Sequence, residues 1–427
     1  MLLSNPRRFL GALLALAFIT FTLGSFGFAQ TETTLFTFPN GTTTTNPYTL
    51  ISDGHGNFFG TAIGGNGSVF ELSPATGGGW TVTTIYAFPG ATGPYYPEAL
   101  VMDPAGNIYG ANNGGRLTNV YGEIYKLSPN GQGGWTYSTI YQFHGSDGRF
   151  PQGSLLFDSA GNLYGTTNQG GQCPTDSKGC GLVYELSPQS NGKWTEQLLY
   201  HFGAFSGDGR YPASGLVFDS KGNLYGTTTG GGLTGCPNSN EYCGTVFELV
   251  HTAKGWKEKI LYALTISQGE YPHDAPTLDA AGNLYATAYE GGAQLYGTVF
   301  ELTPTSQGEW KFHLIHSFNS YTTGAIPVGG VTFDATGNLI VATQDGGVNG
   351  PPCSTNGTAS GCGSVWQFTP TGTGTWKSKL LYVFTGGSDG RELDDLKLVL
   401  DVNGNIFGAA LYGGDSNSDG TIFEITP

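Results

Sequence analysis

Seven segments of the chain share one short sequence pattern, in which an Asp and a Gly-Asn pair precede an apolar and often aromatic run. The clearest copy is DSAGNLYGTT at residues 158–167, and the copies recur at intervals of 50 to 67 residues. They begin at Asp53, Asp103, Asp158, Asp219, Asp279, Asp334 and Asp401. Similarity at such a period is typical of solenoids, propellers and arrays. The repeat therefore constrains the fold more than any local feature does.

Each unit contains four short apolar runs with turn residues between them, and no segment after residue 30 sustains a helical period. In the third unit we expect strands at 154–158 and 162–167. Asp158 and Gly161 occupy the first and fourth positions of the link, as a type I turn with a following left-handed residue requires. The third strand is a run such as GTVFELTP at 297–304, and the fourth starts at a Trp, as in WTEQLLYHF from Trp194. Each unit is therefore predicted to form a four-stranded sheet.

The number of fourth strands indicates how the sheets are joined. Only six Trp-initiated runs exist, because the seventh unit ends after its third strand, while TLFTF at residues 34–38 resembles the end of a fourth strand. We predict an all-β, seven-bladed β-propeller with four-stranded blades, closed by the N-terminal strand. A β-helix or an open row of hairpins is the alternative, but it leaves the missing strand unexplained.

The third strand carries a Glu at a fixed position, as at Glu71, Glu185, Glu248, Glu301 and Glu424. A catalytic acid is needed once rather than five times. We therefore expect these side chains to bond to backbone or hydroxyl groups between neighbouring sheets.

Residues 1–29 have the pattern of a secretory signal: Arg7 and Arg8 precede an apolar run at 10–23, and Gly27-Phe28-Ala29 forms a cleavage site. A membrane anchor is the alternative, but the apolar run is short. The RRFL sequence also permits twin-arginine export, although its spacing is poor. The mature chain is then expected to be a single propeller, residues 30–427, with no membrane span.

The charge balance excludes some partners. With 32 acidic residues, and 15 basic ones once Arg7 and Arg8 leave, the mature net charge is near −17. Nucleic acids and anionic membranes need a basic footprint, so neither is an expected partner. We expect a monomer that is secreted, periplasmic or at the cell surface.

Six cysteines fall in pairs inside single repeats: Cys173 with Cys180, Cys236 with Cys243, and Cys353 with Cys362. Export favours disulfides. A metal site would need Cys-x-x-Cys or interleaved His ligands, and the sequence has neither. We therefore predict three disulfides.

Loops that join the fourth strand of one blade to the first of the next share a face with the loops between second and third strands, and binding residues often lie in such loops. Aromatic rings for stacking and charged groups for hydroxyls predict a ligand-binding face there. Its candidate residues are Tyr96, Asp147, Arg149, Phe150, Asp208, Arg210, Tyr211, Tyr271, Asp389 and Arg391. These residues recur from blade to blade, so the alternative is that they pack one blade against the next.

An enzyme would break the repeat symmetry. The clearest departure from the repeat pattern is one such loop that contains Glu270, His273 and Asp274. These residues are candidates for general acid and base catalysis.

No cofactor is expected, with one possible exception. Asp415, Asn417 and Asp419 match the first half of a calcium loop, followed by Gly420. Position twelve is Thr426 where a bidentate Glu is expected, which favours an ordinary polar loop.

With these units in place, the chain resembles the GloVer tandem-repeat family of exported bacterial proteins, whose repeats carry the same D-x-x-G-N-L-Y-G-T-T, G-G and G-T-V-F-E-L runs. The resemblance covers residues 34–427. Unit six departs from it, with Leu339-Ile340-Val341 for the aromatic and glycine and Trp366-Gln367 for Phe-Glu. Family members often end in a surface-sorting tail, and the sequence here stops at the last strand, so the resemblance implies a freely secreted or periplasmic form. It implies no activity.

Three functional hypotheses follow. The first is a non-enzymatic binding or interaction module for an extracellular polymer, such as a glycan, or for a surface protein. The second is a propeller enzyme, such as a polysaccharide lyase or hydrolase, that acts at the channel mouth. The third is a structural component of the cell envelope.

Overall fold

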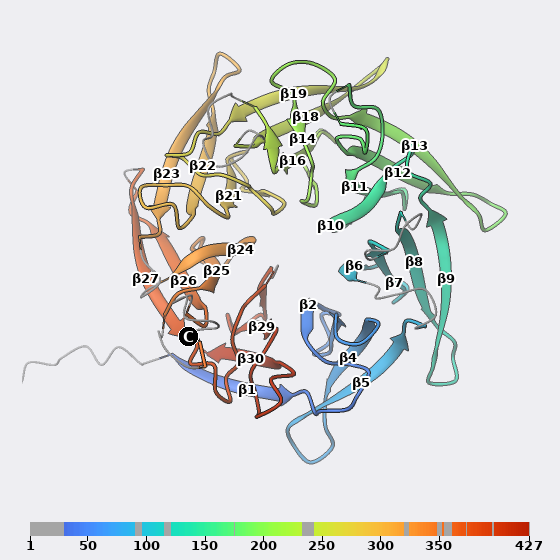
Figure 1. The fold of residues 1–427 in the computed structure, drawn as a ribbon, viewed down its shortest axis with the longest axis vertical. Coiled ribbons are helices and arrows are strands. Elements are labelled where there is room, and N and C mark those ends of the chain that lie inside the picture. The colour runs from blue at the N-terminus through green and yellow to red at the C-terminus, as the bar shows by residue number, and fades with distance from the viewer. Residues whose placement is uncertain are drawn as a thin grey trace, which may run out of the picture.

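The computed structural model describes residues 30–89, 96–114, 121–174, 176–232, 243–319, 324–347, 352–353, 361–372, 374–394 and 397–426. They form seven four-stranded antiparallel sheets arranged radially around a central axis (Figure 1). The predicted seven-bladed, all-β propeller is confirmed. The predicted signal segment 1–29 lies outside the described residues.

The first four blades follow the chain in order. Blade 1 contains β2 (Pro47–Ser52), β3 (Phe58–Ala62), β4 (Ser68–Pro74) and β5 (Trp80–Ala87). Blade 2 contains β6 (Pro97–Met102), β7 (Ile108–Asn112), β8 (Glu123–Pro129) and β9 (Trp135–Gln142). Blade 3 contains β10 (Arg149–Phe157), β11 (Leu163–Gln169), β12 (Leu182–Pro188) and β13 (Trp194–His201). Blade 4 contains β15 (Val217–Phe218), β16 (Leu224–Thr228), β18 (Thr245–Thr252) and β19 (Gly255–Ala263), and the short pair β14 (Gly209–Arg210) and β17 (Gly230–Gly231) lies beside it.

The last three blades complete the ring. Blade 5 contains β20 (Thr277–Leu278), β21 (Leu284–Ala288), β22 (Thr298–Pro304) and β23 (Trp310–Ser317). Blade 6 contains β24 (Ala325–Phe333), β25 (Leu339–Asp345), β26 (Ser364–Pro370) and β27 (Trp376–Val383). Blade 7 contains β28 (Val399–Leu400), β29 (Ile406–Ala410), β30 (Thr421–Thr426) and β1 (Thr31–Thr37).

The two ends of the chain share blade 7. Strand β1 pairs antiparallel with β30, with Thr31 opposite Thr426 and Thr37 opposite Thr421. Phe38, which follows β1, is buried with 1% of its surface exposed. The predicted closure by the N-terminal strand is therefore confirmed, and it removes the open edge that an isolated sheet would present.

The repeated Asp forms the tight turn between the first and second strands. In blade 3, Oδ1 of Asp158 accepts hydrogen bonds from the backbone N–H groups of Ala160 and Asn162, each at 2.9 Å, and Oδ2 accepts one from Nδ2 of Asn162 at 2.8 Å. Gly161 has a φ of 85°, which favours glycine. Backbone geometry therefore accounts for the turn motif.

Packing explains the Gly of the second strand and the Trp of the fourth. A Cβ on Gly165 would lie 2.3 Å from Oη of Tyr184, so only glycine lets this buried ring cross the strand. Trp194 of blade 3 packs edge-on against Tyr109 of blade 2, with ring centroids 6.0 Å apart. The hydrophobic core consequently lies between adjacent blades, as in the cluster that joins Phe202 of blade 3 to blade 4.

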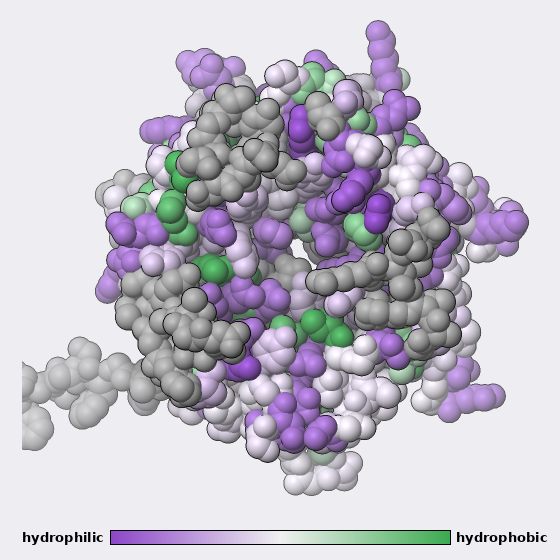
Figure 2. Space-filling view, viewed as in Figure 1, coloured by the Kyte–Doolittle hydropathy of each residue, from purple (hydrophilic) through white to green (hydrophobic). Residues whose placement is uncertain are grey.

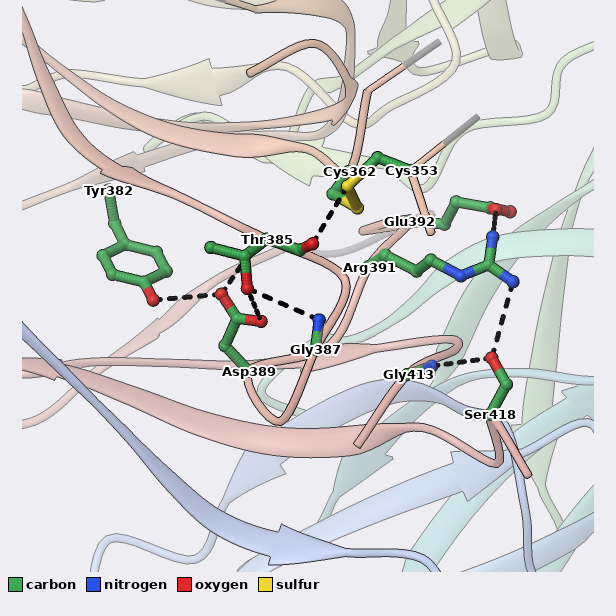
Figure 3. Close-up of a disulfide and its surroundings, with 10 residues drawn as sticks. All are labelled: Cys353, Cys362, Tyr382, Thr385, Gly387, Asp389, Arg391, Glu392, Gly413 and Ser418. Carbon is green, nitrogen blue, oxygen red and sulfur yellow. Dashed lines mark hydrogen bonds and ion pairs between the residues drawn. A yellow bond between two sulfur atoms is a disulfide. The ribbon is translucent and has the colours of Figure 1, made fainter. Parts of the chain in front are cut away.

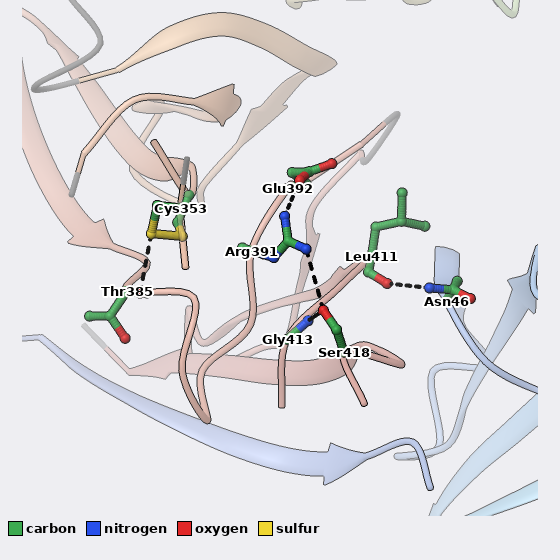
Figure 4. A network of polar contacts seen from close by, with 9 residues as sticks. Asn46, Cys353, Thr385, Arg391, Glu392, Leu411, Gly413 and Ser418 are labelled. Atoms are coloured by element: carbon green, nitrogen blue, oxygen red, sulfur yellow. Dashed lines mark hydrogen bonds and ion pairs between the residues drawn. A yellow bond between two sulfur atoms is a disulfide. The ribbon is translucent and has the colours of Figure 1, made fainter. Parts of the chain in front are cut away.

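A hydrogen bond between successive blades recurs at the residue before the first-strand Pro. Tyr211 has a φ of 55° and donates its backbone N–H to the carbonyl of Cys180 in blade 3 at 2.8 Å. Pro212 then packs on Gly181, where an added Cβ would lie 2.5 Å from the ring. The same positive φ and bond recur at Asn46, Phe150, Tyr271, Ile326 and Glu392. In blade 1, Asn46 also donates Nδ2 to the carbonyl of Leu411 at 3.0 Å (Figure 4).

Two of the three predicted disulfides are present among the described residues, Cys173–Cys180 and Cys353–Cys362. Figure 3 shows the second, whose Cys353 Sγ lies 3.1 Å from the carbonyl oxygen of Thr385. Cys236, the predicted partner of Cys243, lies outside the described residues.

The repeated Glu of the third strand bonds to a hydroxyl, as predicted. The prediction that this bond joins neighbouring sheets is wrong. Tyr225 donates to Oε1 of Glu248 at 2.8 Å, and Tyr285 donates to Oε1 of Glu301 at 3.0 Å. In each case the two residues are direct partners on adjacent strands of one sheet. The bond therefore lies within a blade rather than between blades.

None of the described segments forms a helix of sufficient length and hydropathy to span a bilayer.

Candidate active site

The first strands of the blades surround a central cavity of about 540 Å³. Every blade contributes to its lining, from Tyr48 in blade 1 to Val399 in blade 7. The space-filling view shows this face of the molecule hollowed at its centre (Figure 2). The volume lies in the range of small-molecule sites, roughly 300–1,000 Å³.

A second cavity of about 410 Å³ shares four lining residues with the central one, Tyr48, Glu98, Ala213 and His273. The two are therefore parts of one depression. In each blade, the residue directly after the first-strand Pro, or after Leu393 in blade 7, lines this second cavity. We call these residues the mouth ring: Tyr48, Glu98, Gln152, Ala213, His273, Val328 and Asp394.

The mouth ring is where the repeat symmetry fails. The preceding position is Pro in six blades, yet no two blades carry the same residue at the ring position itself. Turn residues, strand glycines and inter-blade bonds repeat because each blade needs them for folding. Seven different side chains around one opening serve no such shared need, which makes the mouth the best candidate for a functional site.

Glu98 supplies a buried carboxylate to the mouth. Its side chain is 6% exposed, and Oε1 accepts a hydrogen bond from Nδ2 of Asn113 at 2.8 Å. The side-chain amide fixes one carboxylate oxygen, so the group is oriented before any ligand arrives.

His273 supplies an imidazole on the blade 5 side. Its ring lies 5.5 Å from that of Tyr289, measured between centroids, and Tyr289 in turn donates its hydroxyl to Oε1 of Gln344 at 3.1 Å. Tyr289 and Gln344 also line the second cavity. His273 is thus placed beside a hydrogen-bonded aromatic wall.

Asp274 lines the central cavity next to His273 and is positioned through its own backbone. Oγ1 of Thr227, in blade 4, lies 3.1 Å from the carbonyl oxygens of both Pro272 and Asp274. Oγ1 of Thr287 lies 3.5 Å from Oδ2 of Asp274. Residues of blades 4 and 5 therefore hold this loop in place.

Lys397 approaches from blade 7 and is the one lysine among the lining residues of the central cavity. Its side chain keeps contact with solvent, but the cavity walls remove hydration, and this desolvation lowers the pKa of its amine. The negative charge of Asp274 acts in the opposite direction and is the smaller effect. The positions four residues before the turn Asp in blades 3 to 6 hold Ser154, Gly215, Ala275 and Gly330, so the long cationic side chain is specific to blade 7.

Together, these residues can perform acid and base chemistry. A carboxylate, an imidazole and an amine line one water-accessible cavity from blades 2, 5 and 7. Imidazole and carboxyl groups exchange protons near neutral pH, and an ammonium stabilises a developing oxyanion.

The structure separates the three predicted catalytic candidates. His273 and Asp274 line the central cavity, whereas Glu270 does not. Glu270 is 1% exposed and lies at an inter-blade contact, with Oε1 3.7 Å from Sγ of Cys243. Burial, and secondarily the charge of Glu290, raise the pKa of Glu270.

The predicted ligand-binding acids accept hydrogen bonds from their own loops. Asp208 accepts from the hydroxyl of Tyr200 at 2.9 Å and from the backbone N–H of Ala204 at 2.8 Å. Asp389 accepts from Tyr382 and Thr385 in the same arrangement (Figure 3). The third acid, Asp147, accepts from the backbone N–H of His144 at 2.7 Å.

The predicted aromatic and arginine residues lie in the same inter-blade loops or, like Arg149, Phe150 and Arg210, in short strand segments beside them. Arg149 stacks on the Phe150 ring at 4.3 Å, and Tyr211 donates its hydroxyl to Asp176 at 2.8 Å. Arg391 pairs with Glu392 and donates to Oγ of Ser418 at 3.4 Å (Figure 4). Tyr96, Arg210 and Tyr271 are half-buried in the equivalent segments of other blades. None of the ten predicted ligand-binding residues lines either cavity.

The calcium candidate forms a turn. Oδ1 of Asp415 accepts hydrogen bonds from the backbone N–H groups of Asn417 and Ser418, at 2.8 and 3.2 Å. The carbonyl of Asp419 accepts the inter-blade bond from Asn46. Within the described ranges, no group of three or more His, Cys, Asp and Glu side chains is arranged to hold a metal ion. Calcium binding there stays a prediction.

Two cavity residues, Glu98 and Lys397, were missed by sequence reasoning. Aligning the repeats on the Pro would have found Glu98, because the next position varies in every blade. Alignment on the Pro does not find Lys397, since blade 7 lacks the Pro and its first-strand segment is longer, but alignment on the turn Asp does.

Solved structures share the fold at low sequence identity. A candidate 6-phosphogluconolactonase from Bacteroides uniformis has a TM-score of 0.50 and 14% identity, covering 81% of this chain and 85% of its own. A gluconolactonase from Xanthomonas campestris has a TM-score of 0.42 and 15% identity, covering 73% and 86%. A luciferin-regenerating enzyme has a TM-score of 0.44 and 15% identity, covering 77% and 92%. No curated protein matches the sequence significantly.

These comparisons correct the first functional hypothesis. It held that the propeller is a non-enzymatic binding or interaction module, whereas the candidate 6-phosphogluconolactonase that shares this fold is named as an enzyme. The physical reason is that the recurrent loop residues lie outside the channel, whereas ionisable groups from several blades line it.

The sequence itself matches the profile of the Gloeobacter/Verrucomicrobia repeat in three overlapping regions, residues 19–236, 117–352 and 238–427. These regions span the whole propeller, in agreement with the repeat pattern and the seven equivalent blades. The chain belongs to the Gloeobacter/Verrucomicrobia repeat family.

Proposed function

We propose that the protein is a hydrolase that acts on a small carbohydrate-derived substrate at the mouth of its channel. The observation that carries the proposal is the mouth ring. Seven equivalent positions hold seven different side chains around a cavity of small-molecule size, and Lys397 and Asp274 lie in the same cavity. Binding alone could reuse repeated side chains, whereas catalysis needs unlike groups that act together.

The roles follow from the chemistry of each group. The neutral imidazole of His273 accepts the proton of the attacking water. The ammonium form of Lys397 stabilises the oxyanion that develops on the substrate. Glu98, on the opposite side of the mouth, acts in its protonated, carboxylic acid form and delivers that proton to the leaving group. Asp274 holds a negative charge close to Lys397 and so favours its cationic form.

The size of the cavity favours a short substrate over a long polymer. About 540 Å³ accommodates a mono- or disaccharide derivative, whereas a polysaccharide could present only its end. We also propose that the enzyme works outside the cytoplasm. Support comes from the Cys173–Cys180 and Cys353–Cys362 disulfides, which are typical of proteins from oxidising compartments.

The test is turnover by the purified mature chain on sugar lactones, sugar esters, aryl glycosides and uronate polymers, with separate detection of hydrolysis products and of the unsaturated products of a lyase. His273→Gln and Glu98→Gln should each lower kcat at least about 100-fold, the usual contribution of a general acid or base. His251→Gln, at an exposed position outside the cavity, is the matched control and should retain full activity. Absence of turnover on every substrate, unsaturated products, or equal activity of the His273 and His251 variants would each refute the proposal.

A further inference from the structure

Beyond the mouth, the character of the channel changes from polar to apolar. Two residues before the turn Asp, the first strands carry Ile51, Leu156, Val217, Thr277 and Val399, all of which line the central cavity. We call these five residues the throat ring. Each is only partly buried, so part of each side chain faces the channel, while the four apolar members also pack against the inter-blade core.

The one polar residue of the throat ring, Thr277, donates its hydroxyl proton to another blade. Thr277 in blade 5 donates its hydroxyl to the carbonyl of Val331 in blade 6 at 2.6 Å. Thr332, at the same register in blade 6, donates to the carbonyl of Leu398 in blade 7 at 3.0 Å. These hydroxyls therefore hold one blade to the next and leave no free donor for a ligand.

Water in such a throat finds few partners. Five of the seven mouth-ring side chains can form hydrogen bonds, but the throat below offers mainly aliphatic carbon. Displacing poorly bonded water by an apolar group is favourable in proportion to the apolar area covered. Both environments belong to one continuous cavity, so a single ligand can occupy them at once.

We propose that the substrate is amphiphilic, with an alkyl or aryl group that enters the throat ring and a polar sugar-like end that stays at the mouth ring. The assignment of the polar end as the reacting end rests on the proposed hydrolase. The apolar subsite does not, because it follows from the throat residues alone.

The test measures binding without turnover. Methyl, butyl, hexyl and octyl thioglucosides resist hydrolysis and are titrated calorimetrically into the mature chain, each below its critical micelle concentration. Affinity should rise about fourfold for each added methylene until the throat is full. Affinity that does not depend on chain length, or no binding at any length, would overturn the proposal.

Variants locate the subsite. Val217→Phe fills the throat from blade 4, and Leu156→Gln makes it polar from blade 3. Each should weaken hexyl binding at least tenfold and change methyl binding less than twofold. Val402→Phe, at a fully exposed turn position, is the matched control and should bind as the wild type does. A retained dependence on chain length in both throat variants, once thermal unfolding shows them folded, would contradict the assignment.

Two further outcomes separate this inference from the proposed function. Chain-length-dependent binding without turnover of any substrate would refute the hydrolase and leave the apolar subsite standing. Turnover in which short and long alkyl substrates have equal KM would support the hydrolase and refute the subsite.

Discussion

The hydroxyl oxygen of Tyr141 in blade 2 lies 2.8 Å from Oε2 of Glu196 in blade 3, and it lies 2.8 Å from Oδ2 of Asp147 as well. A hydroxyl has one proton to donate, so both contacts are hydrogen bonds only if one carboxyl group carries a proton. Burial, with the nearby charge of Asp147, raises the pKa of Glu196 to about 7. Glu196 is therefore the group that takes up a proton as the pH falls through about 7.

This arrangement makes stability depend on pH. The pKa of Glu196 rises from an ordinary 4.5 to about 7, so the folded chain holds the proton more tightly than the unfolded chain. Its contribution is complete below about pH 4.5 and is lost as the pH rises through about 7. Glu196→Gln keeps a donor toward Tyr141 without the titration. At pH 8.5 it should increase the free energy of unfolding by about 1–2 kcal/mol, after allowance for solvent screening.

Urea unfolding at pH 5 and pH 8.5 checks this expectation. At pH 5 the Gln variant and the wild type should agree within about 0.5 kcal/mol. Glu309→Gln, at an exposed turn, is the control and should show no such difference between the two pH values. A Gln variant less stable than the wild type at pH 8.5 would mean that the ionised carboxylate of Glu196 stabilises the fold, which contradicts a raised pKa.

The next interface has the same residue types, a Tyr, an Asp and a Glu. Tyr200 bonds to Asp208 at 2.9 Å, and burial together with the charge of Asp208 raises the pKa of Glu258 to about 8. Oε1 of Glu258 and Oδ1 of Asp208 are buried without a hydrogen-bond partner. Glu258→Gln should therefore flatten the loss of stability between about pH 4.5 and pH 8, as measured by the same urea titrations. Loss of stability with an unchanged slope would show that this carboxyl does not titrate there.

Removal of β1 tests the closure of the ring. A chain lacking residues 30–38 loses the outer strand of blade 7 and the buried ring of Phe38. Burial of that ring alone contributes about 2 kcal/mol, and the strand hydrogen bonds add to it. We expect the melting temperature to fall by at least about 5 °C. A synthetic peptide of residues 30–39, added in excess, should restore it, and an unchanged melting temperature in the truncated chain would contradict closure.

Local chemistry and counting were enough to predict the architecture. The Asp158 turn involves five consecutive residues, and its recurrence counts the blades. The missing seventh fourth strand, together with the orphan run at 34–38, then determined how the ring closes. Each of these inferences depends only on residues that are close in sequence or on the number of repeats.

The site could not be predicted in the same way, because its placement depends on backbone direction. Glu270 and His273 are three residues apart, yet one is buried at a blade interface and the other lines the channel. Between them the chain passes through Tyr271, with a φ of 53°, and then Pro272. A left-handed residue re-aims the chain, so the alternation of side chains expected for a strand does not apply across it.

Asp274 should control the protonation of Lys397. Its charge raises the pKa of that amine against the larger, lowering effect of desolvation. Asp274→Asn should therefore lower the pKa of Lys397 further and speed its reductive methylation at a given pH. Mass spectrometry of the Lys397 peptide across a pH series measures the rate. Methylation of exposed Lys254 in the same samples is the internal control, and an equal rate at Lys397 in both proteins would show that the two groups do not interact.

Leu295 allows a test of backbone strain away from any site. It has a φ of 66° and is 47% exposed, so an apolar side chain occupies the left-handed region with little burial to offset the cost. That conformation costs a non-glycine residue about 1–2 kcal/mol, less for Asn, and more for a β-branched residue. Leu295→Asn should raise the free energy of unfolding by up to about 1 kcal/mol, and Leu295→Val should lower it. Urea titrations of the three proteins give the order directly. If Val proves as stable as Asn, the left-handed conformation at this position carries no strain, and the gain expected from Asn loses its basis.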